Sequence, residues 1–349
     1  MRLAADYGWE IIQSRASFEG TPDDPLLRVA SAGGTVTAVR AGRYLIATGS
    51  VPWAAPIDGL ADAGFLTSET AMELDAVPSS LLLIGGGYVA MEQAQVFSRL
   101  GSAVTMLVRT RLASAEEPDA GEAIDKVFAE DGITAVVLQA VPAAVRRNRS
   151  GLVEVIARAA GMSRKYRAAR LLVAMGRRPA MDGLNLSSGG VVTGSRGEVV
   201  VDEFLRTGNR RVWAAGDVAG HREFVDVAVA QGGFAVDNMF TDAVRGVDYR
   251  GLLRVIFTDP APAAVGMTES EAAASGVRCR CRVLPLEHVP RALVDRDMRG
   301  LVKMVADAGT GRIVGVTAVA AGARELAAAR GHILAAGLTV DQVARAWSP

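Results

Sequence analysis

The 349-residue chain is too long for one ordinary core, so two or three domains are expected. Its 38 basic and 38 acidic residues balance, which excludes bulk attraction to nucleic acid or to an anionic membrane. The longest uncharged run, residues 76–91, is too short and too glycine-rich to span a bilayer, and no secretory signal pattern is found. We therefore expect a cytoplasmic protein with no nucleic-acid or membrane partner.

The first residues predict an incomplete sheet domain. Residues 25–50 alternate polar and apolar positions and end in an apolar strand at 44–47, which Thr48 and Gly49 close. Prolines then make the chain loop-rich as far as Pro78. A domain boundary is therefore predicted near residue 78.

Residues 79–183 predict a self-contained unit in which strands and helices alternate. A strand and a glycine turn lead into a helix at 90–100, a strand at 104–108 and a helix at 119–131. A closing strand at 171–175 precedes Gly176. This alternation is typical of parallel strands joined by crossover helices, so the fold class is α/β.

The rest of the chain divides into two further segments. Residues 184–250 contain strands and turns, including an apolar strand that ends at Gly216 and Asp217. After residue 250 the pattern changes to longer alternating strands and amphipathic helices, which predicts a separate domain over 251–349.

The most specific motif is a glycine turn that follows the strand at 81–84. Its pattern is G-x-G-x-x-A, and the residues are Gly85, Gly86, Gly87, Tyr88, Val89 and Ala90. In a dinucleotide site the first glycine permits the tight turn, the second lets the backbone approach a pyrophosphate, and the last small residue keeps the helix close to its strand. The helix N-terminus offers N–H groups to the anion. A structural glycine turn is the alternative interpretation.

The end of the second strand indicates which nucleotide binds. An NAD site places an acid about 20 residues after the glycines, where it holds the ribose 2′-hydroxyl. Here that position is Val108, followed by Arg109 and Arg111, whose guanidinium groups suit a 2′-phosphate. The pattern favours NADPH. The alternative is that both arginines are solvated surface residues.

Cysteine and histidine usage predicts no metal site. Cys279 and Cys281 are the only cysteines, and they alternate along a predicted strand at 277–284. Their thiols then share one face with Cα atoms roughly 6.5–7 Å apart, at or past the limit for an unstrained disulfide. The three histidines are scattered without ligand spacing. We expect ordinary thiols, with a soft-metal or redox role as the minor alternative.

These segments together resemble the flavoprotein disulfide reductase family, and its mercuric reductase branch most closely. The matching motifs lie at residues 47–50, 83–92, 174–179, 213–217 and 257–266. Residues 289–292 with Arg299 and Gly300 favour the mercuric reductase branch over the lipoamide dehydrogenase and glutathione reductase branches.

The resemblance implies two cofactors, FAD and NADPH, and a role for each motif. It implies a partial FAD-binding domain at 1–78, a Rossmann-like NADPH-binding domain at 79–183, a return to the FAD-binding domain at 184–250, and an α+β dimerisation domain at 251–349 that forms a homodimer. Tyr88 and Glu92 would support the flavin face, and Glu92 would pair with a lysine. The implied FAD contacts are Thr48, Gly49, Gly216, Asp217 and Val225, and the implied NADPH contacts are Gly85–Ala90, Arg109, Arg111 and Gly176.

The resemblance also implies parts that this sequence lacks. Family members begin with their own FAD-binding glycine motif and a redox-active C-x-x-x-x-C helix, and mercuric reductases end in a further cysteine pair; none of these is present. Three hypotheses follow. The chain is an incomplete mercuric reductase-like enzyme, inactive alone; or a catalytically dead remnant that binds NADPH; or a relative that reduces a disulfide or a quinone.

Overall fold

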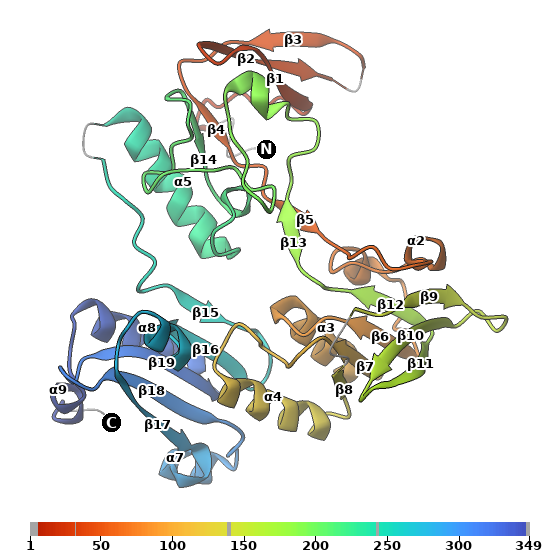
Figure 1. Ribbon diagram of the computed structural model, residues 1–349, viewed down its shortest axis with the longest axis vertical. Coiled ribbons are helices and arrows are strands. Elements are labelled where there is room, and N and C mark those ends of the chain that lie inside the picture. Colours follow the sequence, from red (N-terminus) through yellow and green to blue (C-terminus); the bar gives the residue numbers. More distant parts are fainter. Residues whose placement is uncertain (1–5, 32, 138–140, 242–243, 347–349) are drawn as a thin grey trace. The chain divides into compact units, whose positions relative to one another are not determined.

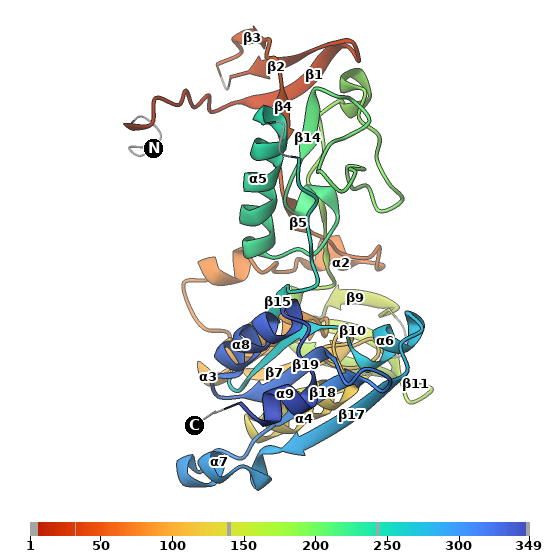
Figure 2. The same ribbon diagram turned by 90° about the vertical axis from the view of Figure 1, so that its left-hand side faces the viewer.

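The computed structural model describes residues 6–31, 33–137, 141–241 and 244–346 (Figures 1 and 2). Contacts divide the chain into two compact units, residues 1–51 with 177–247 and residues 52–176 with 248–349. Most of the first and third predicted segments therefore share one unit, and most of the second and fourth share the other. The exact bounds of the four predicted segments stay a prediction.

The first unit combines a small antiparallel sheet with a pair of parallel strands. Strand β4 (Tyr44–Ile46) lies parallel to β14 (Val212–Ala214), although about 170 residues separate them in the chain. Helix α5 (Val225–Phe240) runs beside this pair (Figure 2). The antiparallel sheet has the order β1-β2-β3. Its strands are β1 (Arg15–Thr21), β2 (Asp24–Ala30) and β3 (Val36–Val39).

Tyr44 connects the antiparallel sheet to the parallel pair. Its ring packs edge-on against Phe18 with centroids 5.7 Å apart, and its hydroxyl donates to the Pro25 carbonyl over 2.6 Å. The polar end of a buried tyrosine needs such a partner. These two contacts fix the position of the first residue of β4. They thereby also fix the direction of the chain that leads to Thr48 and Gly49.

The second unit contains the predicted parallel sheet, with strand order β12-β6-β7-β8. The apolar residues of β6 alternate between two faces. Leu81 and Leu83 belong to the core that packs against helices α3 and α4, while Leu82 and Ile84 belong to the core on the other face. Burial on both faces explains the uninterrupted apolar run in this strand. The elements are β6 (Ser80–Ile84), α3 (Tyr88–Arg99), β7 (Ala103–Val108), α4 (Pro118–Glu130), β8 (Thr134–Val137) and β12 (Arg170–Val173).

A three-stranded antiparallel sheet covers the face opposite the helices. Its order is β11-β10-β9. Val153, Val155 and Ala157 of its central strand are buried against the parallel sheet. The strands are β9 (Ala144–Arg147), β10 (Val153–Ala159) and β11 (Met162–Ala168). The parallel sheet is thus shielded on both sides, and its strand ends remain available for a ligand.

The C-terminal part of the second unit is a five-stranded antiparallel sheet of order β15-β16-β19-β18-β17. Helix α8 (Ala323–Ala335) packs on β16 and β19, where Ala323 and Ala327 are fully buried. The strands are β15 (Leu253–Val255), β16 (Ala261–Gly266), β17 (Cys279–Pro285), β18 (Leu301–Asp307) and β19 (Ile313–Ala320). Short helices are α2 (Leu60–Ala63), α6 (Glu269–Ala274), α7 (Pro290–Asp295) and α9 (Val340–Ala344).

These elements confirm the α/β class with Rossmann-like parallel strands and a C-terminal α+β domain. The predicted helices at 90–100 and 119–131 and the strand at 104–108 are found within two residues of their expected bounds. No helix in the described part of the chain has the length and apolar character needed to cross a membrane.

Candidate dinucleotide and flavin sites

The three glycines of the turn after β6 differ in the space around them. Gly85 has a φ of +147°, and a Cβ there would lie 2.2 Å from the Ala174 carbonyl oxygen. A Cβ on Gly86 would lie 2.6 Å from Cγ1 of Val108. Around Gly87, by contrast, a Cβ would meet no described atom within 4 Å. The first two glycines permit close packing, and the third leaves space in front of the helix.

Helix α3 begins directly behind that space. Gly87 is its N-cap in an extended conformation, and no side chain caps this end. The first N–H groups of a helix lack intrahelical acceptors and carry a partial positive charge. The open space at Gly87, the uncapped N–H groups and the partial positive charge of the helix start together suit the pyrophosphate of a dinucleotide.

The end of β7 lies against this turn. The amide of Ala113 donates to the Gly86 carbonyl over 2.9 Å, which ties the segment after β7 to the glycines. Val108, at the position of the acid in an NAD site, is 2% exposed and packs inward. The predicted 2′-phosphate residues therefore extend from the strand end next to the turn.

The two arginines at this strand end differ. Arg111 donates to the carbonyls of Ala113 (2.9 Å), Ser114 (3.1 Å) and Glu116 (2.6 Å), so its guanidinium holds the loop before α4. Arg109 is exposed. Its side chain is better placed than that of Arg111 to meet a phosphate from solvent, and a nucleotide role for either stays a prediction.

Gly176 lies after β12, the edge strand that pairs with β6. It has a φ of +134°, and its carbonyl accepts the Trp53 amide over 2.9 Å. Gly85, Arg109 and Gly176 therefore all follow neighbouring parallel strands at their carboxyl ends. This is the edge at which open α/β sheets bind ligands.

The predicted flavin residues of the first unit also follow adjacent parallel strands. Thr48 and Gly49 come after β4, and Gly216 and Asp217 come after β14. Ser50 donates to the Asp217 carboxylate over 2.6 Å, so the two segments are in contact.

The contact between Ser50 and Asp217 is extended by Arg177. Its Nε lies 2.7 Å from the Ser50 hydroxyl oxygen, and its Nη2 donates to the Ser50 carbonyl over 2.8 Å. Gly216 has a φ of +78°, and its amide donates to the Gln231 side chain over 2.7 Å. Asp217 is thereby held at the strand end with one carboxylate oxygen on Ser50, and its carboxylate can accept further hydrogen bonds from a polyol.

Helix α5 presents apolar side chains to solvent near its start. Val225 is 83% exposed and Val229, one turn later, is 72% exposed. Two exposed valines on adjacent turns are unusual for a helix that packs on a sheet, and they suit the packing of a planar apolar group. The predicted contact of Val225 with the flavin stays a prediction.

Of the two residues expected to support the flavin face, Glu92 contacts the C-terminal domain of its unit and Tyr88 contacts the segment before α4. Glu92 accepts the Phe257 amide over 2.9 Å, and burial raises the pKa of its carboxyl. The Tyr88 hydroxyl donates to the Glu116 carboxylate. Within the part of the chain that the structure describes, no lysine forms an ion pair with Glu92. A flavin role for both residues stays a prediction.

Buried ion pairs join the nucleotide-binding part to the C-terminal sheet, and the sequence did not predict them. Arg254 of β15 binds Glu116 through two bonds, from Nε to Oε1 over 2.9 Å and from Nη2 to Oε2 over 3.0 Å. Lys303 of β18 binds Glu117 over 3.0 Å and Asp119 over 2.8 Å. Both glutamates precede α4, so these pairs fix where that helix begins.

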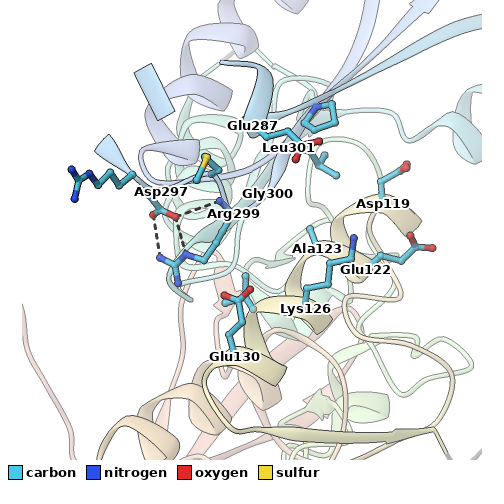
Figure 3. Close-up of a pocket in the computed structure, with 14 residues that line it drawn as sticks. Asp119, Glu122, Ala123, Lys126, Glu130, Glu287, Asp297, Arg299, Gly300 and Leu301 are labelled. Atoms are coloured by element: carbon cyan, nitrogen blue, oxygen red, sulfur yellow. Dashed lines mark hydrogen bonds and ion pairs between the residues drawn. The ribbon is translucent and has the colours of Figure 1, made fainter. Parts of the chain in front are cut away.

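A pocket of about 530 Å³ lies between α4 and residues 285–301 (Figure 3). Glu122, Lys126 and Glu130 of α4 form one side. On the other side Arg299 and Asp297 bind each other, with Nε 2.8 Å from Oδ1 and Nη2 3.1 Å from Oδ2. None of the predicted cofactor residues lines this pocket. Its charges are mutually paired or exposed, and they define no ligand.

Known proteins match this chain over its whole length. The sequence pattern of the family described as "Pyridine nucleotide-disulphide oxidoreductase" matches residues 2–232, and that of its dimerisation domain matches residues 252–349. Among solved structures, LpdA from Mycobacterium tuberculosis is similar with a TM-score of 0.86 and 27% identity, covering 99% of this chain and 75% of that one. The Cu(II) complex of the HOCl-induced flavoprotein disulfide reductase RclA from Escherichia coli has a TM-score of 0.87 at 27% identity, covering 98% and 76%.

Three relatives with a described activity are mercuric reductases. The chain is 50% identical to that of Streptomyces lividans over 347 residues, which cover 99% of this chain and 72% of that protein. It is 39% identical to that of Bacillus cereus, covering 100% and 54%, and 38% identical to that of Staphylococcus aureus, covering 99% and 62%. The chain thus spans 54 to 72% of the length of these three relatives. It belongs to the pyridine nucleotide-disulphide oxidoreductase family.

Proposed function

We propose that this chain supplies the NADPH site and half of the FAD site of a mercuric reductase-type oxidoreductase. The family uses FAD and NAD(P)H. The observation that carries the proposal is the pair of motif sets at the carboxyl ends of parallel strands, around Gly87 in one unit and around Asp217 in the other. The identity of 50% to the mercuric reductase of Streptomyces lividans favours Hg²⁺ as the electron acceptor.

The chain's own residues bind and orient the cofactors in this proposal. The N-terminus of α3 binds the pyrophosphate of NADPH, and Arg109 binds its 2′-phosphate. Asp217 accepts hydrogen bonds from the ribityl hydroxyls, and Val225 packs against the ring system. When both cofactors are bound, they supply hydride transfer to the flavin and electrons for a cysteine pair that reduces Hg²⁺.

The cysteine pair that receives these electrons is not among the residues of this sequence. Cys279 and Cys281 are its only cysteines, and both lie in the C-terminal domain. We therefore expect the purified chain to be nearly colourless and to leave NADPH unoxidised when Hg²⁺ is added. The measurements are the flavin absorbance and the NADPH absorbance over time. Stoichiometric yellow flavin with mercury-dependent turnover would contradict this expectation and would also exclude the remnant hypothesis.

Supplying the missing segment tests the proposed function directly. The parts of the Streptomyces lividans mercuric reductase that lie outside its match are fused in frame to this chain. We expect the fusion to retain flavin and to oxidise NADPH when Hg²⁺ is added, and Asp217→Ala in the fusion to lose flavin. A fusion that retains flavin but oxidises NADPH only with a disulfide or a quinone would place the chain in another branch of the family.

Arg109 is expected to set the preference for NADPH. Replacing it by alanine removes a charge-assisted contact, so NADPH binding should weaken about tenfold to a hundredfold while NADH binding changes little. Arg111→Ala is the matched variant, because its guanidinium holds backbone carbonyls and its loss should lower the melting temperature instead. Both are measured by nucleotide titration and thermal unfolding. Equal dissociation constants for the two nucleotides in the unmodified chain would remove the argument for NADPH.

The dimerisation domain at 252–349 supports a homodimer as the assembly of the complete protein. We also propose a cytoplasmic location, because NADPH is the proposed reductant. Sedimentation of the fusion protein would test the dimer.

A further inference from the structure

Two thiols face one another on the edge strand of the C-terminal sheet. Cys279 and Cys281 alternate along β17, so both side chains lie on the same face. Their sulfur atoms are 3.8 Å apart, and both residues are half-buried free cysteines. Because both residues are only partly buried, these thiols are accessible to a small solute.

A carboxylate from another element completes the cluster. Glu269 is the first residue of α6, the short helix that packs against β17. One carboxylate oxygen of Glu269 and the two sulfurs all lie within 4.8 Å of one another. The helix start is fixed by a capping box in which the Thr268 side chain accepts the Glu271 amide, so the position of Glu269 is set by the fold.

The surroundings of this cluster carry excess negative charge. Lys303 binds Glu269 over 2.9 Å, and the same ammonium also binds Glu117 and Asp119. Three carboxylates therefore share one cation. A bound dication would offset the negative charge of these carboxylates.

We propose that Cys279, Cys281 and Glu269 bind one thiophilic divalent cation of the Zn²⁺ or Cd²⁺ class. Two thiolates with a carboxylate are a donor set that Zn²⁺ accepts, and three protein ligands leave a fourth position for water. With a metal–sulfur bond of about 2.3 Å, tetrahedral coordination separates two sulfurs by about 3.8 Å, whereas a linear ion would need about 4.6 Å. The observed separation of 3.8 Å fits the tetrahedral ion.

Binding involves no redox step. Each thiol loses its proton to solvent and forms one metal–sulfur bond, and Glu269 contributes a carboxylate oxygen. The ion would join α6 to the edge strand β17. The site is independent of the proposed cofactor sites, because its ligands come from residues 269–281 alone.

Cobalt(II) titration of the untagged, reduced full-length chain tests the proposal. Tetrahedral Co²⁺ with thiolate ligands gives intense visible bands and a sulfur-to-metal charge-transfer band in the near ultraviolet. We expect one Co²⁺ per chain and displacement of these bands by one equivalent of Zn²⁺. Cys281→Ser should lower the charge-transfer band to half its intensity or less, the double variant Cys279→Ser with Cys281→Ser should abolish it, and Glu269→Gln should weaken binding at least tenfold. Glu325→Gln, an exposed carboxylate bound to Arg324, is the matched control and should bind like the unmodified chain.

A thiol-protection assay keeps the proposal testable if a variant fails to fold. Zn²⁺ at one equivalent should protect both thiols of the unmodified chain from a disulfide reagent, and a chelator should restore their reactivity. Absence of protection, octahedral Co²⁺ spectra, or a charge-transfer band that keeps its full intensity in Cys281→Ser would overturn the site. Unchanged affinity in Glu269→Gln would overturn the three-ligand assignment.

Discussion

Replacing Gly87 by alanine is expected to weaken NADPH binding about tenfold to a hundredfold without unfolding the chain. The backbone of Gly87 has a φ of −87°, which alanine adopts readily, and the added methyl group meets no described atom within 4 Å. The methyl group would instead occupy the space in front of α3 where the pyrophosphate is proposed to lie, at the cost of about one charge-assisted contact. Nucleotide titration and thermal unfolding of the same preparation measure both effects.

Two other glycines provide the controls for this prediction. Gly251→Ala, in the same unit, also adds a methyl group into open space and should leave both affinity and stability unchanged. Gly85→Ala should unfold the unit at a lower temperature, because its φ of +147° is unsuited to alanine and the methyl group would lie 2.2 Å from a carbonyl oxygen. NADPH affinity in Gly87→Ala equal to that of the unmodified chain would show that the pyrophosphate does not approach this residue.

Local sequence patterns were enough to predict the strand, turn and helix of the proposed nucleotide site. The strand at 80–84, the glycine turn and the following helix depend on neighbouring residues, and each was found in its expected place. The helix begins at Tyr88 and not at the predicted Ala90, because the N-cap is Gly87 itself. Similarly, α4 begins at Pro118, whose fixed φ suits the first helical position, one residue before the prediction.

The polar contacts between distant segments could not be predicted in this way. Arg109 and Arg111 look equivalent in the sequence, but in the structure the Arg111 guanidinium donates to the carbonyls of the loop after β7. Arg109 instead has an exposed side chain. Glu269 looks like an ordinary helix-start acid until β17 brings two thiols beside it. These contacts depend on how the segments pack, and neither periodicity nor spacing carries that information.

Buried charged residues are the contacts that local sequence patterns predict least well. Glu116 and Arg254 are 138 positions apart, and each would be assigned to the surface by its residue type. Their side chains are in fact 3% and 7% exposed. Because two charges share one buried site, the free energy of the pair depends on both partners being present.

Arg254→Met is accordingly expected to lower the free energy of unfolding by about 3–5 kcal/mol. The substitution leaves the buried Glu116 carboxylate without its cation, although the Tyr88 hydroxyl still donates to it, and it removes the bond from Nη1 to the Gly266 carbonyl over 3.0 Å. Urea unfolding followed by circular dichroism measures the loss. Arg250→Met is the matched control, because its guanidinium pairs with Asp248 at an exposed site, and it should change stability by less than about 1 kcal/mol.

A double-mutant cycle separates the ion pair from the packing of the arginine stem. Glu116→Gln alone should also destabilise the chain, since it leaves the Arg254 cation buried without its carboxylate. The double variant Glu116→Gln with Arg254→Met should be more stable than the sum of the two losses predicts, by about 1–3 kcal/mol, because no unpaired charge remains. Additive losses would show that the two side chains contribute independently. In that case the junction between the nucleotide-binding part and the C-terminal sheet would depend on its apolar contacts and on Lys303.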